Sequence, residues 1–382
     1  MIALLGKRDT PTDGVEDYCA HLREALALRG DDLQLVRAPW AEQGWGRALG
    51  WLWRESRGWP GQWTLVQYTA LGWSRHGFSL PFLAVLALLR MRRARVAVVF
   101  HDAEPYHGTR LVDRLRRACQ RRVMRASYRW VQKSIVTVPL PSATFLGPGP
   151  GKAAFVPIGA NIPAAPANGR RSGAGAKTVA VFGVTGGGTV GSEIADIAYC
   201  MRQVSRCFDR PTLLLLGRDS DAAEARLRQA LKGVPVQIEA RGILPPADVS
   251  RALQAADALL FVRGPVSTRK GSAMAGIACG LPVVGYAEPH AGPPLTEAGV
   301  MLVPQGDQGA LAEALIRVLR DGRLWQELHQ RNQRAQAEHF SWNAIAGRLL
   351  NVLDEEFTVD SEQSRAGNPA RFGSRISTSY HA

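Results

Sequence analysis

The sequence predicts an α/β protein made of two doubly wound, Rossmann-like domains. Its 382 residues exceed the roughly 100–200 residues that one domain usually holds. Apolar runs typical of buried strands alternate with segments of helical periodicity in two successive series, a pattern that indicates parallel sheets. Between the two series, residues 157–176 are rich in glycine, proline and alanine, as connections between domains often are.

The first series begins with IALLG, which predicts a buried strand. Residues 15–30 follow it, and their apolar positions have helical spacing that ends at Gly30. Further strands are predicted at LQLVR, TLVQYT, VAVVFHD and SIVTVPLP, and a helix is predicted at LPFLAVLALLR. We therefore assign residues 1–163 to the first domain.

The second series predicts strands at TVAVFG, TLLLLG, VQIEA, LLFV and PVVGY, with helices between them. It ends in helices over residues 307–319 and roughly 324–353. We assign residues 164–176 to a linker, 177–339 to the second domain, and 340–356 to a C-terminal helix that packs back on the first domain. Residues 357–382 are polar and poor in apolar side chains, and we expect them to be disordered.

Composition restricts the class of protein. Apolar residues make up 46% of the chain, which supports a folded protein. No apolar run reaches the ~18 residues that a membrane span needs, and the start MIALLGKRDTPTDG lacks the features of a secretion signal. Five scattered cysteines favour reduced thiols over disulfides or a zinc site. We expect a cytoplasmic protein.

One segment, LLFVRGPVSTRKGSAMAGIACGLPVVGY at residues 259–286, predicts a strand, a basic turn, a helix and a second strand. The first turn of a helix has N–H groups without intrahelical partners and carries partial positive charge, so it attracts phosphate. The alternative is a solvated basic turn that only caps a helix. The turn residues that we assign to phosphate binding are Ser267, Thr268, Arg269, Lys270, Gly271 and Ser272.

The order of several segments resembles the retaining glycosyltransferases of family 4, which have the GT-B fold. These segments are LLLLGRDSD, RGILPPADVSRALQAADALLFV, the phosphate-binding segment, AGVMLVPQGDQGALAEALIRVLRDG and HFSW, with weaker likeness at DGVEDYCAHLREAL, VVFHD and VPIGANIP. The resemblance implies transfer of a sugar, with retention, from a nucleoside-diphosphate sugar to a glycan or lipid-linked acceptor. The second domain would bind the donor and the first would face the acceptor.

The resemblance also implies roles for single residues. His101, which follows the strand VAVVF together with Asp102, would face the donor sugar and is our candidate catalytic residue. It lies at the carboxyl edge of the sheet, where open α/β sheets bind ligands. Gly14 and Gly183 would let the backbone approach the diphosphate or sugar, and Ile243 would contact the base. A structural role for His101 or Gly14 is the alternative.

Four positions differ from the usual pattern of that family. Ser267 and Ala275 stand where many members have glutamates, and Val184 and Val190 stand where an arginine and a lysine are common. In an active enzyme Arg269 and Lys270 would then neutralise the leaving diphosphate. The alternatives are a catalytically impaired GT-B scaffold or sugar-nucleotide-binding protein, and a GT-B sugar-nucleotide epimerase.

The sequence Asp219-Ser220-Asp221 is similar to the metal-binding Asp-x-Asp of the other major glycosyltransferase fold. Here it follows a strand in the second domain of a two-domain pattern, so we assign no metal to it. The resembling family holds diphosphate with basic residues and helix dipoles. We therefore expect no cofactor beyond the nucleoside-diphosphate sugar itself, which is a substrate.

The formal net charge of +14 requires either solvation or an anionic partner. Residues 110–133 form a basic helical stretch, and six tryptophans between Trp40 and Trp63 are interleaved with arginines. Such a surface suits attachment to anionic lipid headgroups at the inner face of a membrane. We expect no nucleic acid partner because no nucleic-acid-binding motif accompanies the charge. General arginine usage on solvated faces is the simplest alternative.

Overall fold

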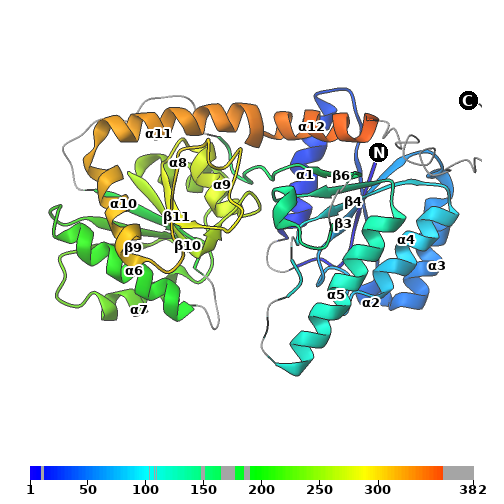
Figure 1. Ribbon diagram of the computed structural model, residues 1–382, viewed down its shortest axis with the longest axis horizontal. Coiled ribbons are helices and arrows are strands. Elements are labelled where there is room, and N and C mark those ends of the chain that lie inside the picture. The colour runs from blue at the N-terminus through cyan, green and yellow to red at the C-terminus, as the bar shows by residue number, and fades with distance from the viewer. Residues whose placement is uncertain are drawn as a thin grey trace, which may run out of the picture.

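The computed structural model describes residues 1–9, 13–102, 104–106, 108, 110–147, 151–164, 177–184 and 190–355. Within these residues the chain forms two parallel six-stranded sheets, each covered by helices on both faces. Figure 1 shows the two domains side by side, which confirms the predicted fold class. The predicted tail at 357–382 and all but the first residue of the predicted linker at 164–176 lie outside the described residues.

The first sheet has the strand order β2-β1-β3-β4-β5-β6, and every neighbouring pair is parallel. Its strands are β1 Ile2–Leu5, β2 Gln34–Arg37, β3 Trp63–Tyr68, β4 Arg95–Phe100, β5 Lys133–Val136 and β6 Ala153–Phe155. The helices around it are α1 Gly14–Ala27, α2 Trp40–Gln43, α3 Trp45–Glu55, α4 Pro81–Met91 and α5 Leu111–Trp130.

The second sheet has the order β12-β11-β10-β7-β8-β9, again with parallel pairs throughout. Its strands are β7 Thr178–Phe182, β8 Thr212–Leu216, β9 Gln237–Ala240, β10 Ala258–Val266, β11 Val283–Ala287 and β12 Val300–Val303. Its helices are α6 Val190–Ser205, α7 Ser220–Ala230, α8 Pro246–Ala255, α9 Gly271–Ala278, α10 Gln308–Arg320 and α11 Gly322–Ala335.

The predicted long helix over residues 324–353 is interrupted. Helix α11 ends in a π-helical turn at Gln336–Phe340, and a separate helix, α12, runs from Trp342 to Asp354. The Ser341 hydroxyl caps α12 by accepting a hydrogen bond from the Ala344 N–H at 3.2 Å. Because of this break, the last helix changes direction and reaches the other domain.

The tryptophan-rich stretch is largely core, which corrects the expected Trp/Arg surface. Trp40, Trp59 and Trp63 are buried, and the ring of Trp45 stacks on that of Trp40 with a centroid distance of 5.1 Å. Only Trp53 of the six is exposed, at 39%. The apolar surface of these side chains is therefore mostly covered by other residues of the first domain.

The five cysteines are free thiols, as expected.

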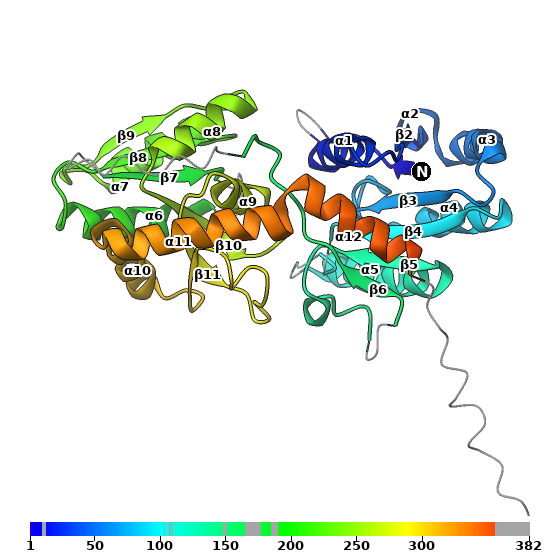
Figure 2. The same ribbon diagram turned by 90° about the horizontal axis from the view of Figure 1, so that it is seen from above.

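Helix α12 crosses from the second domain and packs on α1 of the first (Figure 2). Ile345 and Leu349 lie in the same apolar cluster as residues of α1. The Trp342 indole N–H donates to the Ala160 carbonyl at 2.8 Å, and its ring lies 5.4 Å from the ring of Tyr18. A Cβ at Gly159 would lie 2.7 Å from the Trp342 ring, so a glycine is needed there.

Across the part of the chain that the structure describes, no helix is both long enough and apolar enough to span a membrane.

Replacing Trp342 with alanine should destabilise the first domain by about 2–4 kcal/mol, since it removes a large ring and the hydrogen bond to Ala160. Urea unfolding followed by circular dichroism measures this as a lower midpoint. Trp130→Ala is the control, because Trp130 is 43% exposed. Equal midpoints for the two variants would show that α12 does not stabilise the first domain.

Candidate functional site

A cavity of about 550 Å³ lies where the carboxyl edges of the two sheets face each other. The first domain lines it with the β1–α1 loop, with Gly14, and with His101 and Asp102 after β4. The second domain contributes Arg269 and Gly271. Five residues that the sequence singled out, four of them from the predicted site, therefore meet in one space although they come from both halves of the chain.

His101 is held in one tautomer by Gln67. The amide nitrogen of Gln67 donates to the Leu65 carbonyl at 3.2 Å, so its oxygen accepts from the Nε2–H of His101 at 2.8 Å. This leaves Nδ1 as the acceptor of the neutral ring. Burial lowers the pKa of His101 to about 4, partly opposed by Asp13, so the imidazole is uncharged at neutral pH. It can accept a hydrogen bond from a substrate hydroxyl.

Asp102 faces the second domain's charge. One of its carboxylate oxygens accepts from the Ala70 N–H at 2.8 Å. Burial raises the pKa of Asp102, whereas the hydrogen bond from Ala70 and the guanidinium of Arg269 oppose that shift. Asp102 and Arg269 therefore attract each other across the cavity.

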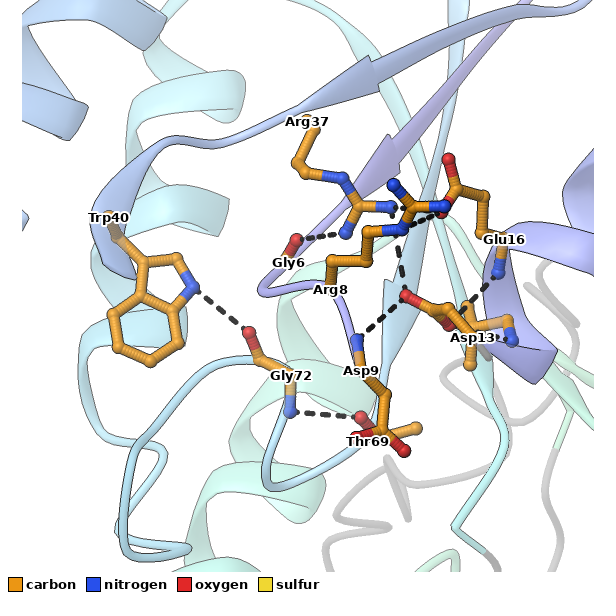
Figure 3. A network of polar contacts seen from close by, with 10 residues as sticks. Gly6, Arg8, Asp9, Asp13, Glu16, Arg37, Trp40, Thr69 and Gly72 are labelled. Atoms are coloured by element: carbon orange, nitrogen blue, oxygen red, sulfur yellow. Dashed lines mark hydrogen bonds and ion pairs between the residues drawn. The ribbon is translucent and has the colours of Figure 1, made fainter. Parts of the chain in front are cut away.

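The β1–α1 loop is positioned by close backbone packing (Figure 3). A Cβ at Gly6 would lie 2.1 Å from the Gly72 carbonyl oxygen, which explains why no side chain is present there. That same oxygen accepts from the Lys7 N–H at 2.7 Å and from the Trp40 indole N–H at 2.9 Å. The Arg37 guanidinium donates to the Gly6 carbonyl at 2.7 Å. These bonds connect the loop to its neighbours.

Charged side chains complete the network at the start of α1 (Figure 3). Asp13 caps the helix by accepting from the N–H groups of Val15 and Glu16 at 3.0 and 3.1 Å. Glu16 pairs with Arg37 at 3.1 Å and with Arg8 at 2.9 Å. The N–H groups in the first turn of α1 are thus already bound by the carboxylate of Asp13.

Gly14 is the first residue of α1 and opens onto the cavity. No described atom lies within 4 Å of the place that a Cβ would occupy there. Gly14 is not one of the glycines with positive φ, so backbone conformation does not explain it. Its proposed use, close approach of a ligand to the backbone, remains a prediction.

The turn before α9 has the geometry of an anion site. Helix α9 starts at Gly271, and in the described structure no side chain caps it. Arg269 is exposed beside it, and Ser272 is half-buried in its first turn. Burial, together with the charges of Arg269 and Arg263, lowers the pKa of Lys270 to about 8. Arg269 and Lys270 thus precede a helix whose first N–H groups have no side-chain cap.

Two hydroxyls of this turn do not face solvent. Thr268 is fully buried and donates to the Thr137 carbonyl at 2.7 Å, while its own carbonyl accepts from the Ile158 N–H at 3.2 Å. The Thr268 hydroxyl therefore uses its proton in a hydrogen bond between the two domains, and its binding of diphosphate remains a prediction. Ser267 is 2% exposed, and its hydroxyl has no hydrogen-bond partner among the described residues.

Gly183 and Ile243 follow other strands of the same sheet. Gly183 follows β7 with φ +81°, a conformation that favours glycine. Ile243 follows β9 and is 62% exposed, next to Gly242, whose carbonyl accepts from the Gly217 N–H at 2.7 Å. Both lie at the ligand-binding edge of the sheet. Residues 185–189, TGGGT, which continue the turn that begins at Gly183, lie outside the described residues.

Two of the departures from the family pattern have a packing reason. Val184 is 5% exposed in the apolar core beside α6, and Ala275 is 1% exposed inside α9. A charged side chain at either position would be buried in an apolar environment. The side chain of Val190 lies outside the described residues.

The Asp219-Ser220-Asp221 triplet begins α7. Asp219 has the left-handed conformation with φ 61°, and the Ser220 hydroxyl accepts from the Gly242 N–H at 3.0 Å. For the residues that the structure places, no group of three or more His, Cys, Asp or Glu side chains could hold a metal ion.

The sequence analysis missed two charged residues near this turn. Arg263 lies in β10 and is exposed, and Glu288 directly follows β11. Burial raises the pKa of Glu288, and the charge of Arg269 is the largest of the effects that lower it. Their positions at the carboxyl ends of central strands could have identified both, since ligand-binding residues of such sheets lie there.

Part of the second domain is similar to a known protein family. Residues 184–321 match the family model described as glycosyl transferases group 1. No curated protein matches the chain.

Solved structures show the same arrangement of both domains. Sucrose-phosphate synthase from Thermosynechococcus elongatus has a TM-score of 0.66 at 20% identity, covering 92% of this chain and 98% of that one. HepE from Anabaena, solved with UDP and glucose, has a TM-score of 0.62 at 14% identity, covering 93% and 99%. WaaG, a glycosyltransferase involved in lipopolysaccharide biosynthesis, has a TM-score of 0.61 at 14% identity. The match covers 93% of this chain and 100% of that one. At these identities the likeness shows the fold, GT-B.

Binding of a nucleoside diphosphate at pH ~8.5 should take up protons, because the bound anion raises the pKa of Lys270 from its value of about 8 in the free protein. Calorimetry in buffers of different ionisation enthalpy measures this uptake, which should disappear near pH ~6.5, where Lys270 is already protonated. Lys270→Arg is the matched control, since arginine stays charged. The same uptake in that variant would assign it to another group.

Proposed function

We propose that this GT-B glycosyltransferase, whose residues 184–321 match the group 1 family, transfers a sugar with retention from a nucleoside-diphosphate sugar to a glycan or lipid-linked acceptor. One observation carries the proposal: the uncapped start of α9 at Gly271 and the nearby Arg269 line the same cavity as neutral His101, and Lys270 lies between them in the chain. The known complex of HepE, a similar structure, with UDP and glucose supports a donor of this class.

The chemistry requires stabilisation of a leaving diphosphate. Charge grows on the diphosphate as the bond to the sugar breaks, and fixed cations and helix N–H groups stabilise such charge without reorganisation. Arg269, Lys270 and the start of α9 would supply them. His101 would accept a hydrogen bond from a hydroxyl of the sugar and orient it, because its neutral ring has an acceptor nitrogen.

Calorimetry with UDP-, GDP- and dTDP-sugars tests donor binding. The enzyme should bind at least one of them, and binding of none at millimolar donor would favour an impaired scaffold instead. Turnover of the bound donor without any acceptor, followed by NMR, would favour the sugar-nucleotide epimerase. NMR of the product with acceptor present reports whether the anomeric configuration is retained.

His101→Ala should lower the transfer rate about 100-fold, because it removes a group that orients the sugar. Donor affinity should change little, since Arg269 and Lys270 remain. The measurement is initial rate and donor Kd for the same preparation. His76→Ala is the control, because His76 is an exposed histidine of the same domain. An unchanged rate for His101→Ala would remove it from the reaction.

The acceptor side points to a membrane surface. Helix α5 extends below the other elements of the first domain in Figure 1. Its start has exposed apolar side chains, Leu111 at 73%, Val112 at 45% and Leu115 at 59%. Exposed arginines continue along the helix at Arg114, Arg121, Arg122, Arg125 and Arg129.

Exposed apolar residues beside arginines fit an anionic lipid surface, where the apolar groups insert and the arginines meet headgroups. Leu111 lies ten residues after His101 in the chain, so the exposed start of α5 follows the cavity residues closely in sequence. We propose that the enzyme works at the inner face of a membrane on a lipid-linked acceptor, as a step in polysaccharide assembly.

The enzyme should sediment with vesicles that contain phosphatidylglycerol and not with phosphatidylcholine alone. Arg121→Ala/Arg125→Ala should weaken this binding about 30-fold, from ~1 kcal/mol for each arginine. Leu111→Ser/Leu115→Ser should weaken it as well, with little effect of salt. Arg226→Ala, an exposed site on α7 of the other domain, is the control. Equal binding to both vesicle types would contradict the proposal.

A further inference from the structure

Arg263 lies where two central strands of the second sheet end. Strands β10 and β7 are parallel neighbours with Ala258 opposite Val179 and Leu259 opposite Ala180, an offset of 79 residues. Arg263 lies further along β10, beside the end of β7, where its Nη1 atom approaches Gly183. The side chain of Val184 is in the core, so the basic group near this end of β7 comes from the neighbouring strand.

The contact with Gly183 supports this placement. The Arg263 Nη1 atom lies 3.0 Å from the position that a Cβ of Gly183 would take. Gly183 has φ +81°, which strains any residue with a side chain. The glycine thus leaves the guanidinium room at the carboxyl edge of the sheet, where ligands of such folds bind.

Arg263 is close to the cations of the α9 turn. Lys270 has its pKa lowered to about 8, and Arg269 and Arg263 both contribute to that shift, whereas Glu193 and Glu288 oppose it. Among the interactions of the described residues, Arg263 has no hydrogen bond or ion pair. An exposed arginine that repels the neighbouring Lys270 and has no carboxylate partner among the described residues is available to a ligand.

We propose that Arg263 binds the diphosphate of the donor as a third cation beside Arg269 and Lys270. The inference rests on the proposed function, since it assigns a further contact within the same site. A guanidinium can donate two parallel hydrogen bonds to phosphate oxygens, which a lysine cannot. The proposal rests on the position of Arg263, which lies beside Gly183 and close to Lys270 of the α9 turn.

Calorimetry of Arg263→Ala with UDP, GDP and dTDP, and with the corresponding monophosphates, tests the assignment. For the diphosphate that the wild-type enzyme binds, the variant should lose at least about tenfold in affinity, the usual cost of one charged hydrogen bond. The monophosphate should lose less than about threefold, because it lacks the second phosphate. Arg263→Lys should lie between alanine and wild type. Arg226→Ala should bind as the wild type does.

The outcomes separate the inference from the function on which it rests. Failure of the wild-type enzyme to bind any of the three diphosphates would overturn the proposed function. Binding by the wild type with no loss in Arg263→Ala would overturn only the role of Arg263. Equal losses for diphosphate and monophosphate would also overturn it, and melting curves of each variant verify that the domain is folded.

Discussion

The site depends on the hydrogen bonds by which Thr268 joins the two domains. Its hydroxyl donates to the Thr137 carbonyl, and its carbonyl accepts from the Ile158 N–H, with the side chain fully buried. A buried donor or acceptor without a partner is costly, so both bonds resist rearrangement. Because Thr268 belongs to one domain and Thr137 to the other, the next residue, Arg269, is held in the cavity of His101 and Asp102.

The electrostatics of the site follow from that placement. Arg263 and Arg269 both lie near Lys270, and with burial, the larger cause, their charges lower the pKa of Lys270. An anion with two negative charges relieves this repulsion and also satisfies the open N–H groups of α9. On the opposite wall, His101 stays neutral because it is buried, so it does not compete for the same anion. The two walls thus have different chemistry.

Local pattern predicted most of the fold because strands and helices have different apolar periods. It failed where the pattern depended on distant partners. The tryptophans near Trp45 looked like a surface, but α3 buries them against β3 and α4 in the core. The domain assignment placed a boundary near residue 340, but the π turn at Gln336–Phe340 was not predicted, because the helical pattern continues through it. In the candidate site, Thr268 was expected to donate its hydroxyl to diphosphate, but in the structure this hydroxyl donates to the Thr137 carbonyl of the other domain.

The sequence by itself determined the two alternating domains, the basic turn before a small-residue helix, and a histidine at a strand end, because each depends on residues close together in the chain. Tertiary structure alone decided which of those residues share a cavity and which hydroxyl forms a hydrogen bond between the domains. It alone placed Arg263 beside Gly183. The reason is physical: strand order and register bring together residues 80 or more positions apart, and no local pattern records which strand lies beside which.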